Sequence, residues 1–388
     1  MEEEKIILQP SYVKDFKCDG IKCDACCCGQ WLIDIDMDTY KKYQRVKNPA
    51  MRKKILSYMK PLEGRANSFY IELNEEGKCP MVGEDRLCYI QKNLGEDALS
   101  ITCKTYPRAV RVVGSLELRL LLLSCPIAAD AALFSKNGME ICTGGVDSIP
   151  WQLATRAGEI EKHVADTMAA ANVILGGLSI LQNTAYTREA RLIILGLFLD
   201  RAEEIKDNVA ALSNLVEYYN SESFKQEIAP LLANWNFYPQ AHKQFMKDLL
   251  LLLREEERFV ALGLLYQTNN DYDKVYDEKH QLLEDNVGQA LDRYLQYEWL
   301  YCGFPFFLEG SFLHNYFAFL LHYKIAELYM YTVFDFTKPI PKDSIIRAII
   351  LMSKKIDHAR NFLPTIVKKV VPFENEPIKL MEVLLRLK

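Results

Sequence analysis

The distribution of the cysteines limits most strongly what this chain can fold into. Eleven cysteines are present, and all but Cys302 lie between Cys18 and Cys142. Thiolates are soft ligands, and four of them suffice for a cubane iron-sulfur cluster or a tetrahedral zinc ion. So dense a set predicts a metal-binding N-terminal region, whereas Cys142 and the isolated Cys302 are expected to be packed thiols.

The start of the chain predicts a reducing compartment. Met1 is followed by acidic residues and by an apolar run of only three residues, Ile6 to Leu8, a pattern that fits neither a secretory signal nor a transit peptide. The longest apolar stretch, Leu116 to Phe134, contains charges and Pro126, so no membrane span is expected. We therefore expect a cytoplasmic protein with reduced thiols, and a disulfide framework is excluded.

The composition bounds the size of the fold and the class of partner. With 388 residues, 49% hydrophobic and 26% charged, the chain has enough material for two domains or one large helical body. The formal net charge of −5 leaves no broad basic field, so we expect neither a nucleic-acid nor a membrane partner. A local basic patch is compatible with this charge.

Local patterns divide the chain into two parts and predict a mainly α fold class. Residues 1–149 are predicted to form a cysteine-rich iron-sulfur or metal-binding domain with short strands. It includes helical pieces from Asp38 to Lys60, broken at Asn48-Pro49, and a hairpin that turns at Gly114-Ser115. In 150–388 helical periodicity dominates, so this part is predicted to be an all-helical domain that binds a substrate or partner.

Five cysteine motifs follow one another in the N-terminal part. They are Cys18 to Cys23 with Cys27, Cys28 and Trp31, then Gly77-Lys78-Cys79-Pro80, Leu87 to Ile90, Leu94 to Arg108, and Ser124-Cys125-Pro126. In order, spacing and flanking residues this region resembles the flagellin lysine N-methylases over residues 8–135. Part of the pattern is also similar to a wider family of zinc- or iron-chelating cysteine proteins. Beyond Pro150 the resemblance is weaker and rests on Arg188 to Leu197 and Asn315-Tyr316.

The resemblance implies an enzyme that transfers methyl groups from S-adenosylmethionine to surface lysines of flagellin and holds a 4Fe-4S cluster. Cys26 lies outside the motif, which leaves eight candidate ligands. Eight thiols exceed the need of one cluster, so either a second metal site exists or some of them are not ligands. The eight are Cys18, Cys23, Cys27, Cys28, Cys79, Cys88, Cys103 and Cys125.

Motifs for the methyl donor are missing, so no catalytic or donor-binding residue is predicted. No Gly-x-Gly turn follows a first strand, and Gly176-Gly177 is expected to mark close helix packing instead. The usual radical spacing Cys-x3-Cys-x2-Cys would start at Cys23 and Cys27 but meets Gln30 where its third cysteine belongs. A cluster could bind the amino acid part of S-adenosylmethionine or supply electrons, and both possibilities stay open.

A non-enzymatic protein is the alternative interpretation. In it, a zinc- or iron-binding thiolate site only stabilises the fold, and the helical part grips a partner as an adaptor. The six histidines are scattered through helical segments and are expected to be packing or surface residues rather than ligands. Tyr106, Tyr316 and Tyr323 are conceivable walls of a lysine channel, although an aromatic core is the expected role of each.

Overall fold

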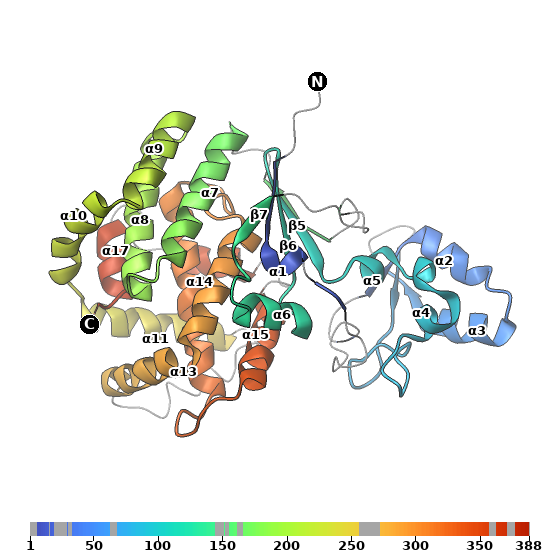
Figure 1. Ribbon diagram of the computed structural model, residues 1–388. Helices are drawn as coiled ribbons and strands as arrows, with labels where there is room; N and C mark the ends of the chain where they lie inside the picture. The colour runs from blue at the N-terminus through green and yellow to red at the C-terminus, as the bar shows by residue number, and fades with distance from the viewer. Residues whose placement is uncertain are drawn as a thin grey trace.

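The computed structural model is mainly helical, which confirms the predicted fold class (Figure 1). A small unit lies at one end of the molecule, and a larger body contains a sheet and most of the helices. The described residues are 6–14, 16–18, 29, 33–62, 68–143, 151, 155–160, 166–255, 272–356, 362–370 and 377–387.

The small unit is built on a three-stranded antiparallel sheet in the order β2-β4-β3. Polar N-cap residues mark where its first two helices begin. The carboxylate of Asp36 accepts a hydrogen bond from the backbone N–H of Thr39 at 2.8 Å, and Asn48 caps the next helix with Pro49 in its first turn. The predicted break at Asn48-Pro49 is therefore confirmed. The strands and helices are β2 (Ile33–Ile35), β3 (Met59–Pro61), β4 (Phe69–Ile71), α2 (Met37–Gln44), α3 (Pro49–Ser57), α4 (Tyr89–Leu94), η2 (Glu96–Ala98) and α5 (Ile101–Thr105).

The small unit has its own hydrophobic core, separate from that of the body. Alternating Ile33 and Ile35 of β2 turn inward and pack with Tyr43 of α2 and Ile55 of α3, all four being fully buried. The described members of this core all lie between Ile33 and Cys103. Because the described residues of this core pack against one another, the unit does not depend on the body for its apolar packing.

The body contains a five-stranded mixed sheet in the order β7-β1-β6-β5-β8. The predicted hairpin is confirmed, since β5 and β6 pair antiparallel and Gly114 adopts the positive φ of 59° that their tight turn requires. The first strand pairs parallel with β6, so the small unit is inserted between β1 and the hairpin. The strands are β1 (Ile6–Pro10), β5 (Arg108–Val113), β6 (Leu116–Leu121), β7 (Ile141–Thr143) and β8 (Thr155–Ile160).

Helices cover this sheet and make up the rest of the body (Figure 1). Helix α14 is apolar around most of its circumference and is buried over nearly its whole length, as expected for a central helix. The helices are α1 (Ser11–Lys14), α6 (Pro126–Phe134), α7 (Thr167–Gln182), α8 (Arg188–Glu204), α9 (Val209–Tyr219), α10 (Glu222–Ala233), α11 (Pro239–Glu255), α13 (Tyr272–Cys302), α14 (Phe312–Val333), α15 (Lys342–Ile356), α16 (Phe362–Val370) and α17 (Pro377–Leu384).

The two hydrophobic cores divide the chain at positions other than the predicted boundary between residues 149 and 150. Leu8 of β1, Leu118 of β6 and Leu133 of α6 share one core with the helices that follow residue 166. Helix α6 packs against α13 and α15. The unit that is separate in packing is thus the segment of about residues 33–105, and the strands on either side of it belong to the helical body.

The glycine pair of α7 confirms the predicted close packing of helices. A Cβ on Gly176 would lie 2.7 Å from ring and methyl carbons of Phe198 and Val216, and a Cβ on Gly177 would overlap the indole of Trp299. That indole cannot easily move, because it is fully buried and its Nε1–H donates to the carbonyl of Ile174 at 2.9 Å. Gly177 therefore lets α7 approach α13 closely, and Gly176 lets it approach α8 and α9.

Gly177→Ala should lower the free energy of unfolding by about 1–3 kcal/mol, because the added methyl group overpacks a rigid site. Denaturant titration followed by circular dichroism measures this. Met168→Ala on the exposed face of the same helix is the control, and its effect should stay within about 0.5 kcal/mol. Equal effects of the two changes would contradict the packing described above.

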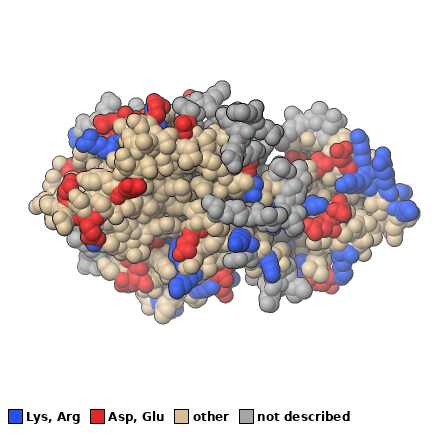
Figure 2. Space-filling view, turned by 45° about the horizontal axis from the view of Figure 1, so that its top comes forward, with Lys and Arg blue, Asp and Glu red and all other residues tan. Residues whose placement is uncertain are grey.

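The surface carries a local basic patch at the free end of the small unit (Figure 2). It lies over α2 and α3, away from the body, and is compatible with the overall acidic charge. None of the helices that the structure describes is long and apolar enough to cross a membrane. The exposed basic residues of the patch are Lys41, Lys42, Arg45, Lys47, Lys53 and Lys54.

Candidate functional site

Three of the candidate cysteines meet in the small unit. Cys79 follows the turn after β4 and is buried, Cys88 occupies the N-cap of α4, and Cys103 lies in α5. The hydroxyl of Ser100 caps α5 by accepting a hydrogen bond from the backbone N–H of Cys103 at 3.2 Å. All three side chains pack against the core of the unit. Turns and helix starts thus bring thiols from three separate motifs to one place.

Tyr43 of α2 packs with these thiols. Its side chain is fully buried in the same core. Burial raises the pKa of Tyr43 far above its ordinary value, and negative charge on Cys103 and Cys88, and to a lesser extent on Cys79, raises it further. The three sulfurs therefore lie within electrostatic reach of one phenol, which stays protonated.

The other candidate ligands are placed differently. Cys18 is exposed shortly after α1, and Cys125 occupies the N-cap of α6 in the core of the body. The neighbour of Cys125, Ser124, shares a hydrogen bond of 3.0 Å with the hydroxyl of Tyr106, which directly follows α5. Cys125 thus lies where the body joins the small unit. Cys23, Cys27 and Cys28, like Cys26, lie outside the described residues.

The two cysteines that were expected to be packed thiols lie in the body. The thiol of Cys142 in β7 donates to the backbone carbonyl of Gln9 at 3.3 Å, across the strand pair with β1. Cys302 ends α13, is 6% exposed, and lies 3.7 Å from a carboxylate oxygen of Glu298. Both have interactions that explain a packed thiol without a metal.

Thiolates are the ligands that thiophilic metal centres use, and the small unit holds three thiols in one core. Cys79, Cys88 and Cys103 come from separate motifs, and Tyr43 packs in the same core. Whether these thiols bind a cluster stays a prediction. The arrangement explains why motifs so far apart in the sequence belong together.

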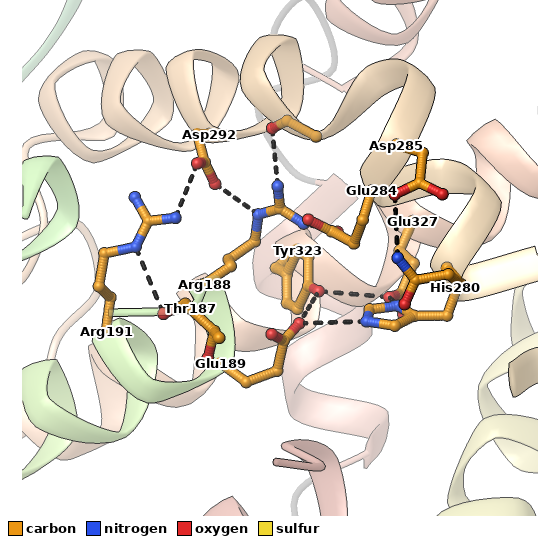
Figure 3. Close-up of polar contacts among 12 residues, drawn as sticks. Thr187, Arg188, Glu189, Arg191, His280, Glu284, Asp285, Asp292, Tyr323 and Glu327 are labelled. Carbon is orange, nitrogen blue, oxygen red and sulfur yellow. Dashed lines mark hydrogen bonds and ion pairs between the residues drawn. The ribbon is translucent and has the colours of Figure 1, made fainter. Parts of the chain in front are cut away.

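A group of polar side chains lies inside the body, between α8, α13 and α14 (Figure 3). Arg188 of α8 is its anchor. The Arg188 guanidinium donates to Asp292 at 2.6 Å, to Glu284, and to the backbone carbonyl of Gly288 at 2.7 Å, all on α13. Arg191, one turn on, donates to the other oxygen of Asp292 at 2.7 Å. These contacts hold α8 against α13.

His280 lies at the other end of this group. Its Nδ1 is 3.0 Å from a carboxylate oxygen of Glu327 on α14, and its Nε2 is 3.7 Å from Glu189 on α8. The hydroxyl of Tyr323 lies 2.9 Å from Glu189 and 3.2 Å from Glu327, and Lys324 pairs with Glu327 at 3.0 Å. A histidine, two carboxylates and a phenol are thus hydrogen-bonded in one buried group.

Neighbouring charges shift the pKa values of His280 and Glu327. Burial disfavours the charged form of His280, but the hydrogen bond and charge of Glu327, together with Glu189, outweigh burial and raise the pKa of His280. Burial alone would raise the pKa of Glu327, whereas Lys324 and His280 hold it well below its ordinary value. Glu327 is therefore a permanent anion inside the body.

This group was not predicted from the sequence. His280 was expected to be packing or surface, although His280 and Glu284 stand four residues apart on one helix and so share a face, which is the signal that was present. Tyr323 belongs to the group, whereas the hydroxyl of Tyr316 donates to the backbone carbonyl of Leu192 at 2.6 Å and serves packing. Asn315 clamps the loop before α14 by bonding both the N–H and the carbonyl of Leu308.

Comparison with known proteins shows to which family the chain belongs. The fold joins a large helical body to a small unit that holds three thiols in its own core. The chain belongs to the FliB lysine N-methylase family, because the family model described as the FliB lysine N-methylase C-terminal domain matches residues 177–380, more than half of the chain. That match covers α8, α13 and α14, and with them the buried polar group.

Individual relatives match over a shorter length. The chain is 34% identical over 142 residues to the lysine-N-methylases of Salmonella choleraesuis strain SC-B67 and Salmonella typhimurium strain LT2, which is 36% of this chain and 35% of each relative. It is also 34% identical over 142 residues to the flagellar biosynthetic protein FliU of Salmonella muenchen, of which the match covers 83%. The match thus spans about a third of the length of the two lysine-N-methylases. No solved structure matches.

Proposed function

We propose that this protein is a protein-lysine N-methyltransferase that uses S-adenosylmethionine to methylate surface lysines of flagellin in the cytoplasm, with a 4Fe-4S cluster held by N-terminal thiols. In the net reaction the bond between the methyl carbon and the donor sulfonium sulfur breaks, and a bond to the lysine nitrogen forms. One proton leaves the amine, and S-adenosylhomocysteine is the second product.

The observation that carries the proposal is the convergence of Cys79, Cys88 and Cys103 around Tyr43 in a chain of the FliB lysine N-methylase family. Names of relatives support lysine methylation, and the name of one relative links it to the flagellum.

These thiols are candidates for holding the cluster, as are Cys18, which is exposed after α1, and Cys125, at the N-cap of α6. When bound, a cluster would supply either a Lewis-acid site for the amino acid part of the methyl donor or a source of electrons. The chain's own contribution is the packed core that holds these thiols. Tyr43 keeps its proton inside this core, and Cys88 lies at the N-cap of α4.

Protein purified without oxygen should contain iron and acid-labile sulfide in near-equal amounts, because reduced thiolates in such a set suit a cluster. Elemental analysis measures this, and mass spectrometry of flagellin co-expressed with the protein measures lysine methylation. Flagellin expressed alone is the control.

Two outcomes would count against the proposal in different ways. Stoichiometric zinc without sulfide, even after iron reconstitution, would remove the cluster and favour the zinc-binding adaptor. A loaded cluster with unmethylated flagellin would instead show that the substrate is another protein.

A further inference from the structure

Three potential metal ligands meet in the buried polar group of the body. One donor atom from each of Glu189, His280 and Glu284 lies within 4.8 Å of the other two. The distance between His280 Nε2 and Glu189 Oε1 is 3.7 Å, too long for a hydrogen bond but close to the ~3.0–3.4 Å that separates two ligands of one ion at bond lengths of about 2.1 Å. The imidazole nitrogen and the carboxylates therefore face a common point.

The outer contacts of these donors are those that metal ligands usually have. The other ring nitrogen of His280, Nδ1, lies 3.0 Å from the buried carboxylate of Glu327, so an Nδ1–H that donates there leaves the Nε2 lone pair directed at Glu189. The Tyr323 hydroxyl fixes Glu189. Arg188 fixes one oxygen of Glu284 and leaves the carboxylate its second oxygen. Each potential ligand is thus held in its orientation by a hydrogen-bonding partner.

The charge of the group is also suited to a cation. Among its hydrogen-bonded members, the carboxylates of Glu189, Glu284, Glu327 and Asp292 outnumber the fixed cations Arg188, Arg191 and Lys324 by one. Excess negative charge inside a protein needs a proton or a metal ion to balance it. Access exists, because the side chain of Glu284 is 30% exposed, whereas that of Glu189 is 10% exposed.

We propose that Glu189, His280 and Glu284 bind a divalent first-row transition-metal ion between α8 and α13, separate from the thiol set of the small unit. One imidazole and two carboxylates form a mixed nitrogen and oxygen donor set, which suits Mn²⁺, Fe²⁺ or Zn²⁺ and is less suited to Ca²⁺ or Mg²⁺. The ion links Glu189 of α8 to His280 of α13, which lies 91 residues further along the chain. Its binding therefore stabilises the folded body. This proposal does not depend on the methyltransferase function.

Manganese is the probe that separates this site from the cysteines, because it prefers oxygen and nitrogen ligands to thiolates. Titration of the full-length protein with Mn²⁺, followed by electron paramagnetic resonance, should show one bound ion per chain. Pulsed measurements on the wild-type complex should show coupling to one imidazole ¹⁴N. Bound Mn²⁺ should also raise the midpoint of thermal unfolding.

Glu284→Gln removes a ligand at the exposed rim and should weaken Mn²⁺ binding at least about tenfold, in line with the loss of a contact in a metal site. Asp285→Asn is the matched control, since this exposed neighbour loses the same charge one residue away and should bind Mn²⁺ like the wild type. Circular dichroism verifies that both variants fold.

Absence of bound Mn²⁺ at millimolar concentration, or bound Mn²⁺ without ¹⁴N coupling, would overturn the proposal. Equal weakening by Asp285→Asn and Glu284→Gln would also overturn it, since general electrostatic attraction would then explain the binding. If Glu284→Gln fails to fold, the ¹⁴N coupling of the wild type decides alone.

Discussion

Cys103→Ser should yield a folded protein without an iron-sulfur cluster that leaves flagellin lysines unmethylated. The hydroxyl is nearly isosteric with the thiol but is a poor ligand for iron, so the metal centre loses one of its soft anions. Iron content after anaerobic purification and mass spectrometry of co-expressed flagellin measure the two effects. We expect the same result for Cys88→Ser, and for Cys27→Ser and Cys28→Ser from the opening motif.

Cys142→Ser and Cys302→Ser are the matched controls, because their thiols already have contacts within the body. Both should keep iron and methylation. Each variant must show the helicity of the wild type, since a folding defect would imitate the loss of a ligand. Iron retained in Cys103→Ser and Cys88→Ser, together with iron lost from Cys302→Ser, would show that the motif-based assignment is wrong.

Arg188→Met should lower the free energy of unfolding by about 3–5 kcal/mol, which is the usual cost of removing one partner from a buried ionic group. The Arg188 side chain is 2% exposed and bonds Asp292, Glu284 and a backbone carbonyl, so its loss leaves buried carboxylates without a counter-charge. Burial works against the charge of Arg188, but Asp292 and the neighbouring groups still raise its pKa, so this cation is present at every accessible pH. Denaturant titration gives the change in free energy.

Arg201→Met on the same helix is the control. Arg201 is 66% exposed and pairs with Glu204 at the surface, so its removal should change stability by no more than about 0.5 kcal/mol. Similar losses of stability in the two variants would mean that the buried polar group contributes little to holding α8 against α13.

Local signals in the sequence predicted local structure well. Asn48-Pro49 broke the helical pieces of the small unit, and Gly114-Ser115 turned the hairpin, because caps, proline and glycine act on the few residues beside them. The continuation of helix to Lys60 was wrong. Met59–Pro61 instead forms β3, since pairing with β4 overrides a short helical pattern.

Long-range pairing was what the sequence could not predict. The parallel partner of β1 is β6, more than 100 residues away, so nothing near Ile6–Pro10 indicates that this strand belongs to the body. The grouping of Glu189 with His280 likewise depends on how α8 meets α13. Among the cysteines, motif resemblance selected Cys79, Cys88 and Cys103, which the structure brings together, but their common neighbour Tyr43 was not identified.

The separate core of the small unit has a consequence for synthesis. Its described members are complete once the ribosome has made Cys103, whereas the core of the body includes both Leu8 and Leu385. Because domains generally fold as units while the chain is being made, the small unit can close first. Strand β1 must wait for its partners, and the body can close only after α17 has emerged. The thiols of Cys79, Cys88 and Cys103 can therefore be assembled in their own core before the body has folded.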